Sequence, residues 1–302
     1  MKQPVIAIIG AGSVGSTLAY SLLLHNVAAN ILMVDVNTDK CEGEVQDLQD
    51  ALAISETSVV QTASLQEAGQ ADIIIITAGI TQKPGETRLE ILQTNHDIIC
   101  SVVSAMKPIK KSSIIITVTN PVDIITRYVQ ELSGLAKQQV FGSGTLLDTI
   151  RLRGFLAQQV GVNPSSIDAY VLGEHGDNQF VAWSTAQIGG VPLHSFISSQ
   201  KTLDDIAFQA RHKVYDIIAH KGFTAFGVAS SLVMYCKSII GDTQRIYPVS
   251  CFIEDFGVYL SMPAVLGLNG VEKILQPILN AQEREKLVQS ADILNECYTR
   301  IR

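Results

Sequence analysis

The chain has 302 residues, of which 47% are hydrophobic and 17% are charged. This composition excludes a disordered chain, and the length suits about two domains with buried cores. The 29 acidic residues outnumber the 22 basic ones, for a formal charge of -7, so no basic surface for nucleic acid or anionic lipid is indicated. No apolar run approaches the roughly 18 residues of a membrane span.

Five cysteines are scattered along the chain without a Cys-x-x-Cys pair. Such a set is unlike a disulfide framework or a zinc cluster, so we expect reduced thiols and no metal site. The first predicted strand begins at Val5, which leaves no room for a signal peptide. We therefore expect a cytoplasmic protein.

Short β-branched runs alternate with helical patterns through the first half of the chain. The run at 73–76 is apolar on both faces, which is typical of a parallel strand covered by helices on each side. The alternation predicts an α/β fold with a doubly wound, Rossmann-type parallel sheet, which we assign to residues 1–143. The predicted strands are 5–9, 31–35, 59–61, 73–77, 114–118 and 139–141.

Residues 10–15 read GAGSVG, a GxGxxG that follows the first predicted strand and opens a helix. Gly10 permits a tight turn, Gly12 lets the backbone approach a pyrophosphate, and Gly15 allows close packing of helix on strand. Asp35 ends the second strand, where a carboxylate can accept hydrogen bonds from a ribose and would repel a 2′-phosphate. This pair of features favours NAD over NADP. Taken singly, the glycines could form an ordinary turn, and Asp35 could cap the turn at Asn37.

Past about residue 145 the regular alternation gives way to a mixture of helices and strands. We assign residues 144–302 to a second, mixed α+β domain that carries the substrate site. No polar linker precedes it, so the two domains should share an extensive interface. The predicted elements are a helix to residue 159, extended segments at 167–172 and 180–188, helices at 202–219, 224–237 and 281–300, and strands at 245–253 and 259–268.

Three segments carry candidate catalytic residues. His175 lies between glycines in GEHGD at the end of an apolar segment, with the access that a general base needs. Asp148 and Arg151 are three residues apart on one predicted helix face, a spacing that a routine salt bridge would also produce. Arg88 ends a polar stretch with Pro and Gly that follows a strand. That composition is typical of a mobile lid, although it also suits an ordinary exposed loop.

In this order the motifs resemble the L-lactate/malate dehydrogenase family from residue 4 to 300, and they are closest to its bacterial-type lactate dehydrogenases. Any one motif is moderate support, whereas the ordered set is hard to produce by chance. The motifs are GAGSVG, the acid at Asp35, TAGITQKPGETRLEIL from Thr77, VTNPVDI from Val118, GSGTLLDTIR from Gly142, GEHGD from Gly173 and KGFTAFGVA from Lys221.

The resemblance implies a role for each candidate residue. His175 would take the hydroxyl proton while the C2 hydride leaves for the nicotinamide, and Asp148 would fix the ring tautomer. Arg151 would clamp the substrate carboxylate. Arg88 would polarise the ketone from a lid, Asn120 would add a hydrogen bond, and Thr224 would line the pocket. The implied NAD-binding residues are Gly10, Gly12, Val14, Gly15, Asp35, Lys40, Ala78, Gly79, Val118, Asn120 and Ser143.

Within the family, Gln82 indicates the substrate. Members that take malate carry arginine at this place in the lid, so a neutral amide leaves a second carboxylate unpaired and favours pyruvate and lactate. Two departures from the lactate dehydrogenase pattern leave bulkier 2-hydroxy acids as alternative substrates. Malate is a further alternative. Lys213 and Val214 stand where many lactate dehydrogenases have two small residues, and residues 180–185 are similar to L-2-hydroxyisocaproate dehydrogenases.

Regulation, assembly and other reaction classes complete the sequence-based hypotheses. Bacterial members activated by fructose 1,6-bisphosphate pair an arginine, matched by Arg153, with a histidine whose place is taken here by Asp168. A carboxylate repels phosphate, so weak or absent activation is expected. The family also implies a homo-oligomer, either a dimer or a tetramer. An NAD-dependent glycosidase of related fold and a silent NAD-binding protein are competing classes.

Overall fold

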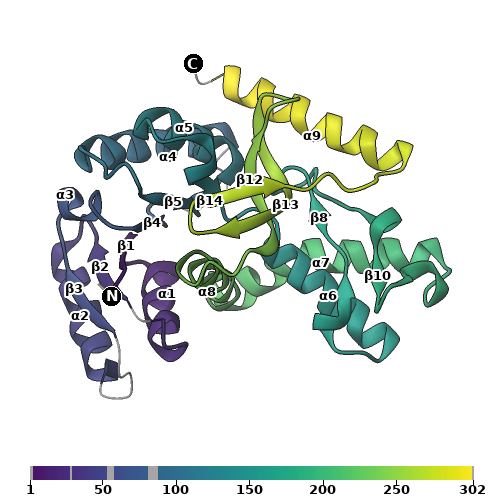
Figure 1. The fold of residues 1–302 in the computed structure, drawn as a ribbon, viewed down its shortest axis with the longest axis horizontal. Helices are drawn as coiled ribbons and strands as arrows, with labels where there is room; N and C mark the ends of the chain where they lie inside the picture. The colour runs from purple at the N-terminus through teal and green to yellow at the C-terminus, as the bar shows by residue number, and fades with distance from the viewer. Residues whose placement is uncertain (1–2, 28, 53–57, 81–87, 301–302) are drawn as a thin grey trace.

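The structure is a computed structural model that describes residues 3–27, 29–52, 58–80 and 88–300. Within these ranges, no helix has both the length and the apolar content that crossing a membrane requires. Figure 1 shows the first half of the chain on the left and centre of the molecule, and most of the second half on the right.

One nine-stranded sheet runs through the molecule in the order β14-β13-β12-β6-β5-β4-β1-β2-β3. Its six parallel strands come from the first half of the chain, and β1 lies between β2 and β4, so the direction of winding reverses there. In doubly wound sheets this switch point is where ligands bind, at the carboxyl ends of the strands. The parallel strands are β1 (Val5–Ile9), β2 (Asn30–Val34), β3 (Val59–Thr62), β4 (Ile73–Ile76), β5 (Ile114–Thr117) and β6 (Val140–Gly142).

Helices cover both faces of this sheet, which confirms the predicted doubly wound architecture. In Figure 1, α4 and α5 lie on one side of the central strands, and α1 lies with α8 on the other. The isoleucines of β4 and β5 are buried on both faces, as a strand between two helical layers requires. The helices of this half are α1 (Ser13–Leu24), α2 (Thr38–Ala51), α3 (Leu65–Ala68), α4 (Arg88–Ala105) and α5 (Val122–Ser133).

The second half of the chain extends the same sheet with antiparallel strands. These are β12 (Arg245–Ile253), β13 (Val258–Gly267) and β14 (Gly270–Ile274), and β12 pairs with β6 at Ser250 and Gly142. One hydrophobic core therefore includes residues from both halves. The proposed boundary at residue 143 falls between β6 and the next helix. The strand β14 has no counterpart among the strands predicted from the sequence.

The remaining helices surround a set of short strands. Helix α7 ends where Gly222 takes a left-handed conformation with φ of 85°, two residues beyond the predicted end. The helices are α6 (Leu146–Val160), α7 (Gln200–Lys221), α8 (Phe226–Ile240) and α9 (Ala281–Thr299). The short strands are β7 (Ile167–Asp168), β8 (Val171–Leu172), β9 (Phe180–Val181), β10 (Gln187–Ile188) and β11 (Val191–Pro192).

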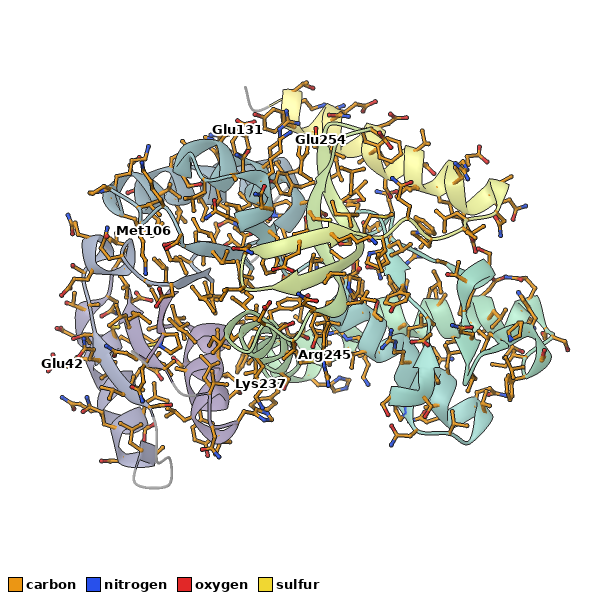
Figure 2. All side chains as sticks on the ribbon, viewed as in Figure 1. Glu42, Met106, Glu131, Lys237, Arg245 and Glu254 are labelled. Carbon is orange, nitrogen blue, oxygen red and sulfur yellow. The ribbon has the colours of Figure 1, made fainter. Side chains whose placement is uncertain are left out.

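The predicted extended segment at 180–188 is wrong in its middle part. A 3-10 turn at Trp183–Thr185 separates β9 from β10. The turn is held from α9, because the Ser184 backbone N–H donates to Glu283 Oε1 over 2.9 Å. Helix α9 is fixed at its other end by Tyr298, whose hydroxyl donates to Glu131 Oε2 of α5 over 2.6 Å, near the label of Glu131 in Figure 2.

Candidate active site

Apart from Lys40 of α2, the predicted cofactor residues lie at or just beyond the carboxyl ends of the parallel strands. Backbone hydrogen bonds continue the sheet past several of these ends, for example from Gly10 N–H to Val34 O and from Ser143 N–H to Thr117 O. The chain therefore leaves each strand in a defined direction. Gly10, Asp35, Ala78, Gly79, Val118, Asn120 and Ser143 follow five neighbouring strands, while Gly12, Val14 and Gly15 form the start of α1.

The three glycines of the loop after β1 meet different surroundings. Gly10 has φ of 108°, and a Cβ there would lie 2.8 Å from Thr77 Oγ1. A Cβ at Gly15 would lie 1.8 Å from the carbonyl oxygen of Gly10, so helix and loop can pack this closely only without a side chain. At Gly12 no atom lies within 4 Å of such a Cβ. The loop thus offers open backbone at the start of α1, which fits the diphosphate of a dinucleotide.

Asp35 binds the glycine loop from the end of β2. Its Oδ2 accepts from the backbone N–H of Ala11 over 2.7 Å, and its Oδ1 accepts from that of Asn37 over 2.9 Å. The turn-capping interpretation of Asp35 is therefore correct. It does not exclude binding of a ribose, because a carboxylate can accept about four hydrogen bonds. Lys40 lies in the exposed first turn of α2, where its backbone N–H donates to Asn37 Oδ1 over 3.1 Å.

Asn95 of α4 is a site residue that the sequence analysis missed. It is fully buried, and its Oδ1 accepts from Ile80 N–H over 2.8 Å. Its Nδ2 donates to the carbonyl oxygens of Ile80 over 3.2 Å and of Asn120 over 2.7 Å. One side chain therefore fixes the segments that follow β4 and β5 next to each other. The only signal in the sequence is a polar residue on the buried face of a helix.

Thr145, which precedes α6, and Thr149 of α6 hold this helix against β8. Thr145 Oγ1 donates to the carbonyl oxygen of Val171 over 2.5 Å, and Val171 N–H donates to Thr149 Oγ1 over 3.0 Å. Asp148 lies between them in the sequence, and its Oδ2 is 3.0 Å from Nδ1 of His175. The residues that the sequence predicts as a catalytic pair are thus in contact.

Arg151 completes this buried cluster. Its Nη1 lies 3.3 Å from Oδ1 of Asp148, so the two carboxylate oxygens face different cations. The side chains of Asp148 and Arg151 are 4% and 9% exposed, whereas that of His175 is 29% exposed. The imidazole is therefore held on its Nδ1 side and partly exposed, which is compatible with the access that a proton-transfer group needs.

The cluster shifts the pKa values of its members in opposite directions. Burial acts to lower the pKa of His175, but the Asp148 and Asp123 carboxylates outweigh it, so that pKa is raised. Burial acts to raise the pKa of Asp148, but the His175 and Arg151 charges outweigh it, so that pKa is lowered. Both shifts favour an ion pair of imidazolium and carboxylate.

Asp123 of α5 supports His175 from its backbone side and was also missed. Its Oδ2 accepts from the His175 backbone N–H over 2.8 Å. Burial raises the pKa of Asp123 to about 6, against hydrogen bonds from Ser250 and His175 that lower it. Asp123 lies in the VTNPVDI motif, where only Asn120 drew attention, because an acid in the first turn of a helix is also an ordinary favourable charge.

Further contacts fix the loop around His175. Gly173, with φ of 88°, exchanges two backbone hydrogen bonds with Ser261 of β13. Beyond the histidine, the Arg211 guanidinium of α7 donates to the carbonyl oxygens of Asp177 and Gln179, each over 3.2 Å. Arg211 is a third supporting residue that no local pattern marks.

The other predicted substrate residues are described to different extents. Thr224 and Arg151 line one cavity of about 470 Å³ between α6, α7 and the start of α8. Arg88 is the first residue of α4, and Asn120 is exposed at the end of β5. Gln82 and the rest of the predicted lid, residues 81–87, lie outside the described residues.

Comparison with known proteins agrees with this geometry. A family model described as "lactate/malate dehydrogenase, NAD binding domain" matches residues 5–142, and one described as "lactate/malate dehydrogenase, alpha/beta C-terminal domain" matches residues 145–301. The chain belongs to the lactate/malate dehydrogenase family. The resemblance, the fold class and the NAD cofactor predicted from the sequence are confirmed. The protein is thus an NAD-dependent oxidoreductase that acts on a hydroxy acid.

Relatives of this dehydrogenase match over nearly its whole length. L-lactate dehydrogenase A of Rhizopus oryzae is 44% identical over 96% of the chain and 90% of its own length. L-lactate dehydrogenase of Limosilactobacillus reuteri is 37% identical over 97% and 94%. Among solved structures, a minor L-lactate dehydrogenase from Enterococcus mundtii has a TM-score of 0.95 at 33% identity, and covers 99% of both chains. A lactate dehydrogenase from a Medee basin deep-sea metagenome library also has a TM-score of 0.95 at 33% identity, with 100% and 99% covered.

Proposed function

We propose that this dehydrogenase is an NAD-dependent L-lactate dehydrogenase that interconverts L-lactate and pyruvate, a reaction of glycolysis and fermentation. One observation carries the proposal beyond family membership. A single buried carboxylate, that of Asp148, contacts both a partly open imidazole and a buried guanidinium, His175 and Arg151. This arrangement supports a proton-transfer role for His175 and a carboxylate-binding role for Arg151.

In the proposed reaction NAD supplies the hydride acceptor, or as NADH the hydride donor, for C2 of the substrate. His175 takes the hydroxyl proton of lactate at Nε2 and returns it to the ketone of pyruvate. Asp148 keeps the other ring nitrogen, Nδ1, protonated and stabilises the imidazolium. Arg151 binds the substrate carboxylate through the part of its planar fork that does not face Asp148.

We further propose the remaining roles that the family resemblance implies. Arg88 polarises the ketone, Asn120 adds a hydrogen bond, and Thr224 lines the pocket beside Arg151. Residues 1–143 form the NAD-binding domain, and residues 144–302 form the substrate domain. The NAD-binding set comprises Gly10, Gly12, Val14, Gly15, Asp35, Lys40, Ala78, Gly79, Val118, Asn120 and Ser143. The open backbone at Gly12 and the position of these residues at the strand ends support this assignment.

Gln82 supports lactate over malate, because a neutral amide leaves the second carboxylate of oxaloacetate without a cation. Bulkier 2-hydroxy acids form the second candidate class of substrate. The cavity beside Arg151, with a volume of about 470 Å³, supports this alternative. A panel of pyruvate, 2-oxobutyrate, 2-oxoisocaproate and oxaloacetate with NADH and NADPH tests the proposal. It requires the highest kcat/KM for pyruvate with NADH, and a preference for another acid or for NADPH contradicts it.

Assembly, location and regulation are part of the same proposal. We propose a cytoplasmic homo-oligomer, a dimer or a tetramer, whose five cysteines stay reduced. Sedimentation of the purified protein tests the assembly, and a monomer would contradict it. Asp168 is exposed on β7, where a carboxylate disfavours a phosphate. Activation by fructose 1,6-bisphosphate should therefore be weak or absent, and strong activation at micromolar concentrations refutes that view.

A further inference from the structure

The cavity that Arg151 and Thr224 share carries more positive charge than binding one substrate carboxylate requires. Besides Arg151, its charged lining residues are Lys213 and Lys221 of α7, and no described Asp or Glu lines it. The chain as a whole has a formal charge of -7, so it repels small anions at long range. This cavity is a local reversal of that sign.

The two lysines face the cavity from one side of α7. They are eight residues apart, which corresponds to about 12 Å along the helix axis and about 80° around it, and both line the cavity. Lys213 Nζ lies 5.3 Å from the ring centroid of Phe155, one turn after Arg151 on α6. Lys221 Nζ lies 3.6 Å from the ring centroid of Phe226, near Thr224. The two ammonium groups therefore border the cavity at its α6 side and at its α8 side.

The positive charges of these lysines remain available to a ligand. Arg151 is compensated by Asp148, whereas the ammonium groups lie over aromatic rings, which hold a cation without cancelling its charge. In the part of the chain that the structure describes, the ion pairs include neither lysine. An adjoining groove of about 610 Å³ contains both lysines and one acid, Asp216, so two ammonium groups face one carboxylate there.

We propose that Lys213 and Lys221 form a cationic rim that captures the anionic 2-oxo acid from solvent and passes it to Arg151. The inference rests on the proposed function, because it takes the 2-oxo acid as the ligand. Both lysines are exposed, so their attraction is screened by salt and modest at contact. The rim therefore acts on the encounter with the substrate rather than on the bound reaction.

The test is the double variant Lys213→Gln/Lys221→Gln, assayed for pyruvate reduction at saturating NADH and at two ionic strengths. At about 0.02 M salt, kcat/KM should fall by about 5- to 10-fold, since charged clefts raise association rates by this order or more. At about 0.5 M salt the Debye length is only a few ångströms, and the difference should shrink to about 2-fold or less. The value of kcat should stay within about 2-fold of the wild type in both cases.

Two further variants separate local from global charge. Lys201→Gln/Lys286→Gln removes two exposed ammonium groups away from the cavity and gives the same net charge, so kcat/KM should not change. Lys213→Arg/Lys221→Arg keeps the rim charge and should retain the wild-type salt dependence. Three results contradict the proposed rim. They are a loss of kcat/KM that is equal at both ionic strengths, a loss in kcat, and an equal loss of kcat/KM in the Lys201→Gln/Lys286→Gln control. Wild-type protein without activity on any 2-oxo acid defeats the proposed function, while an active wild type with an unaffected rim variant defeats only this inference.

Discussion

Replacing Asp148 by Asn tests the electrostatic basis of the proposed reaction most directly. The substitution keeps the size of the side chain and its place in the first turn of α6, between Thr145 and Thr149 in the sequence. It removes the negative charge 3.0 Å from Nδ1 of His175 and leaves the guanidinium of Arg151 uncompensated nearby. Burial of His175 is unchanged and continues to disfavour the imidazolium. The pKa of His175 should therefore move from above the ordinary value to below it.

The size of the shift follows from the contact distance. Two unit charges 3.0 Å apart attract by about 5 kcal/mol at an effective dielectric constant of about 20. The asparagine dipole retains part of this attraction, so we take about half, roughly 3 kcal/mol, as the loss. That corresponds to about two pKa units. The protonated fraction of His175 at pH 7.5 should fall by up to about 100-fold, and kcat/KM for pyruvate with it.

The assay is the pH dependence of kcat/KM in both directions between pH 5 and 9. Pyruvate reduction needs the imidazolium, so in the wild type it is present below the raised pKa of His175 and is lost as the pH rises through it. In Asp148→Asn the pH at which kcat/KM for pyruvate declines should lie about two units lower. The kcat/KM for lactate oxidation, which needs the neutral ring, should fall less. The exposed acid Asp292 of α9 gives the matched control, Asp292→Asn. If Asp148→Asn lowers kcat/KM but the decline stays at the wild-type pH, the electrostatic reasoning is refuted. Asp148 then has a purely orienting role.

Three other substitutions test separate parts of the site. Arg88→Gln should lower turnover by about 100-fold, roughly 3 kcal/mol in the barrier, with a smaller effect on NADH affinity; comparable losses of both in stopped-flow binding and steady-state assays would count against a lid residue. Gln82→Arg should raise kcat/KM for oxaloacetate by about 10-fold or more, about 1.4 kcal/mol, and no gain removes the basis for preferring lactate over malate. Asp123→Ala leaves the partly buried N–H of His175 without its acceptor, so urea unfolding should show a loss of about 1–3 kcal/mol, and an unchanged midpoint would contradict the supporting role.

Local patterns were sufficient for the parallel half of the fold. A run such as Ile73–Ile76 is too short and too β-branched for a helix and too apolar for an exposed strand, which leaves a buried parallel strand. The glycine loop was equally readable, since steric requirements at Gly10 and Gly15 are met within a few residues of the loop or by the adjacent strand. The short strands β7 to β10 fall within the predicted extended segments, but their ends were not predicted and β11 was missed, because two-residue strands have no measurable periodicity. The turn between β9 and β10 depends on Glu283, about a hundred residues away.

The supporting residues of the site were missed for a related reason. Asn95, Asp123 and Arg211 bind backbone groups of segments far away in the sequence. Because every residue type has such backbone groups, the sequence does not show which segment a side chain will bind. Each of them also has an ordinary local explanation as a polar residue on a helix. Only the fold shows that their partners are the segments on either side of the proposed site.

The spacing of Asp148 and Arg151 is compatible with a routine helix salt bridge and with a catalytic role. Three residues apart on a helix, an acid and a base form an ion pair in both cases, and the structure contains that ion pair. An exposed pair would contribute little and need no third partner. Here both side chains are almost entirely buried, and desolvation makes a buried charge costly unless further groups compensate it. His175 supplies that compensation 27 residues later in the chain, because Thr145 and Thr149 hold α6 against the strand that leads to it. Burial, rather than spacing, therefore makes the pair a candidate for catalysis.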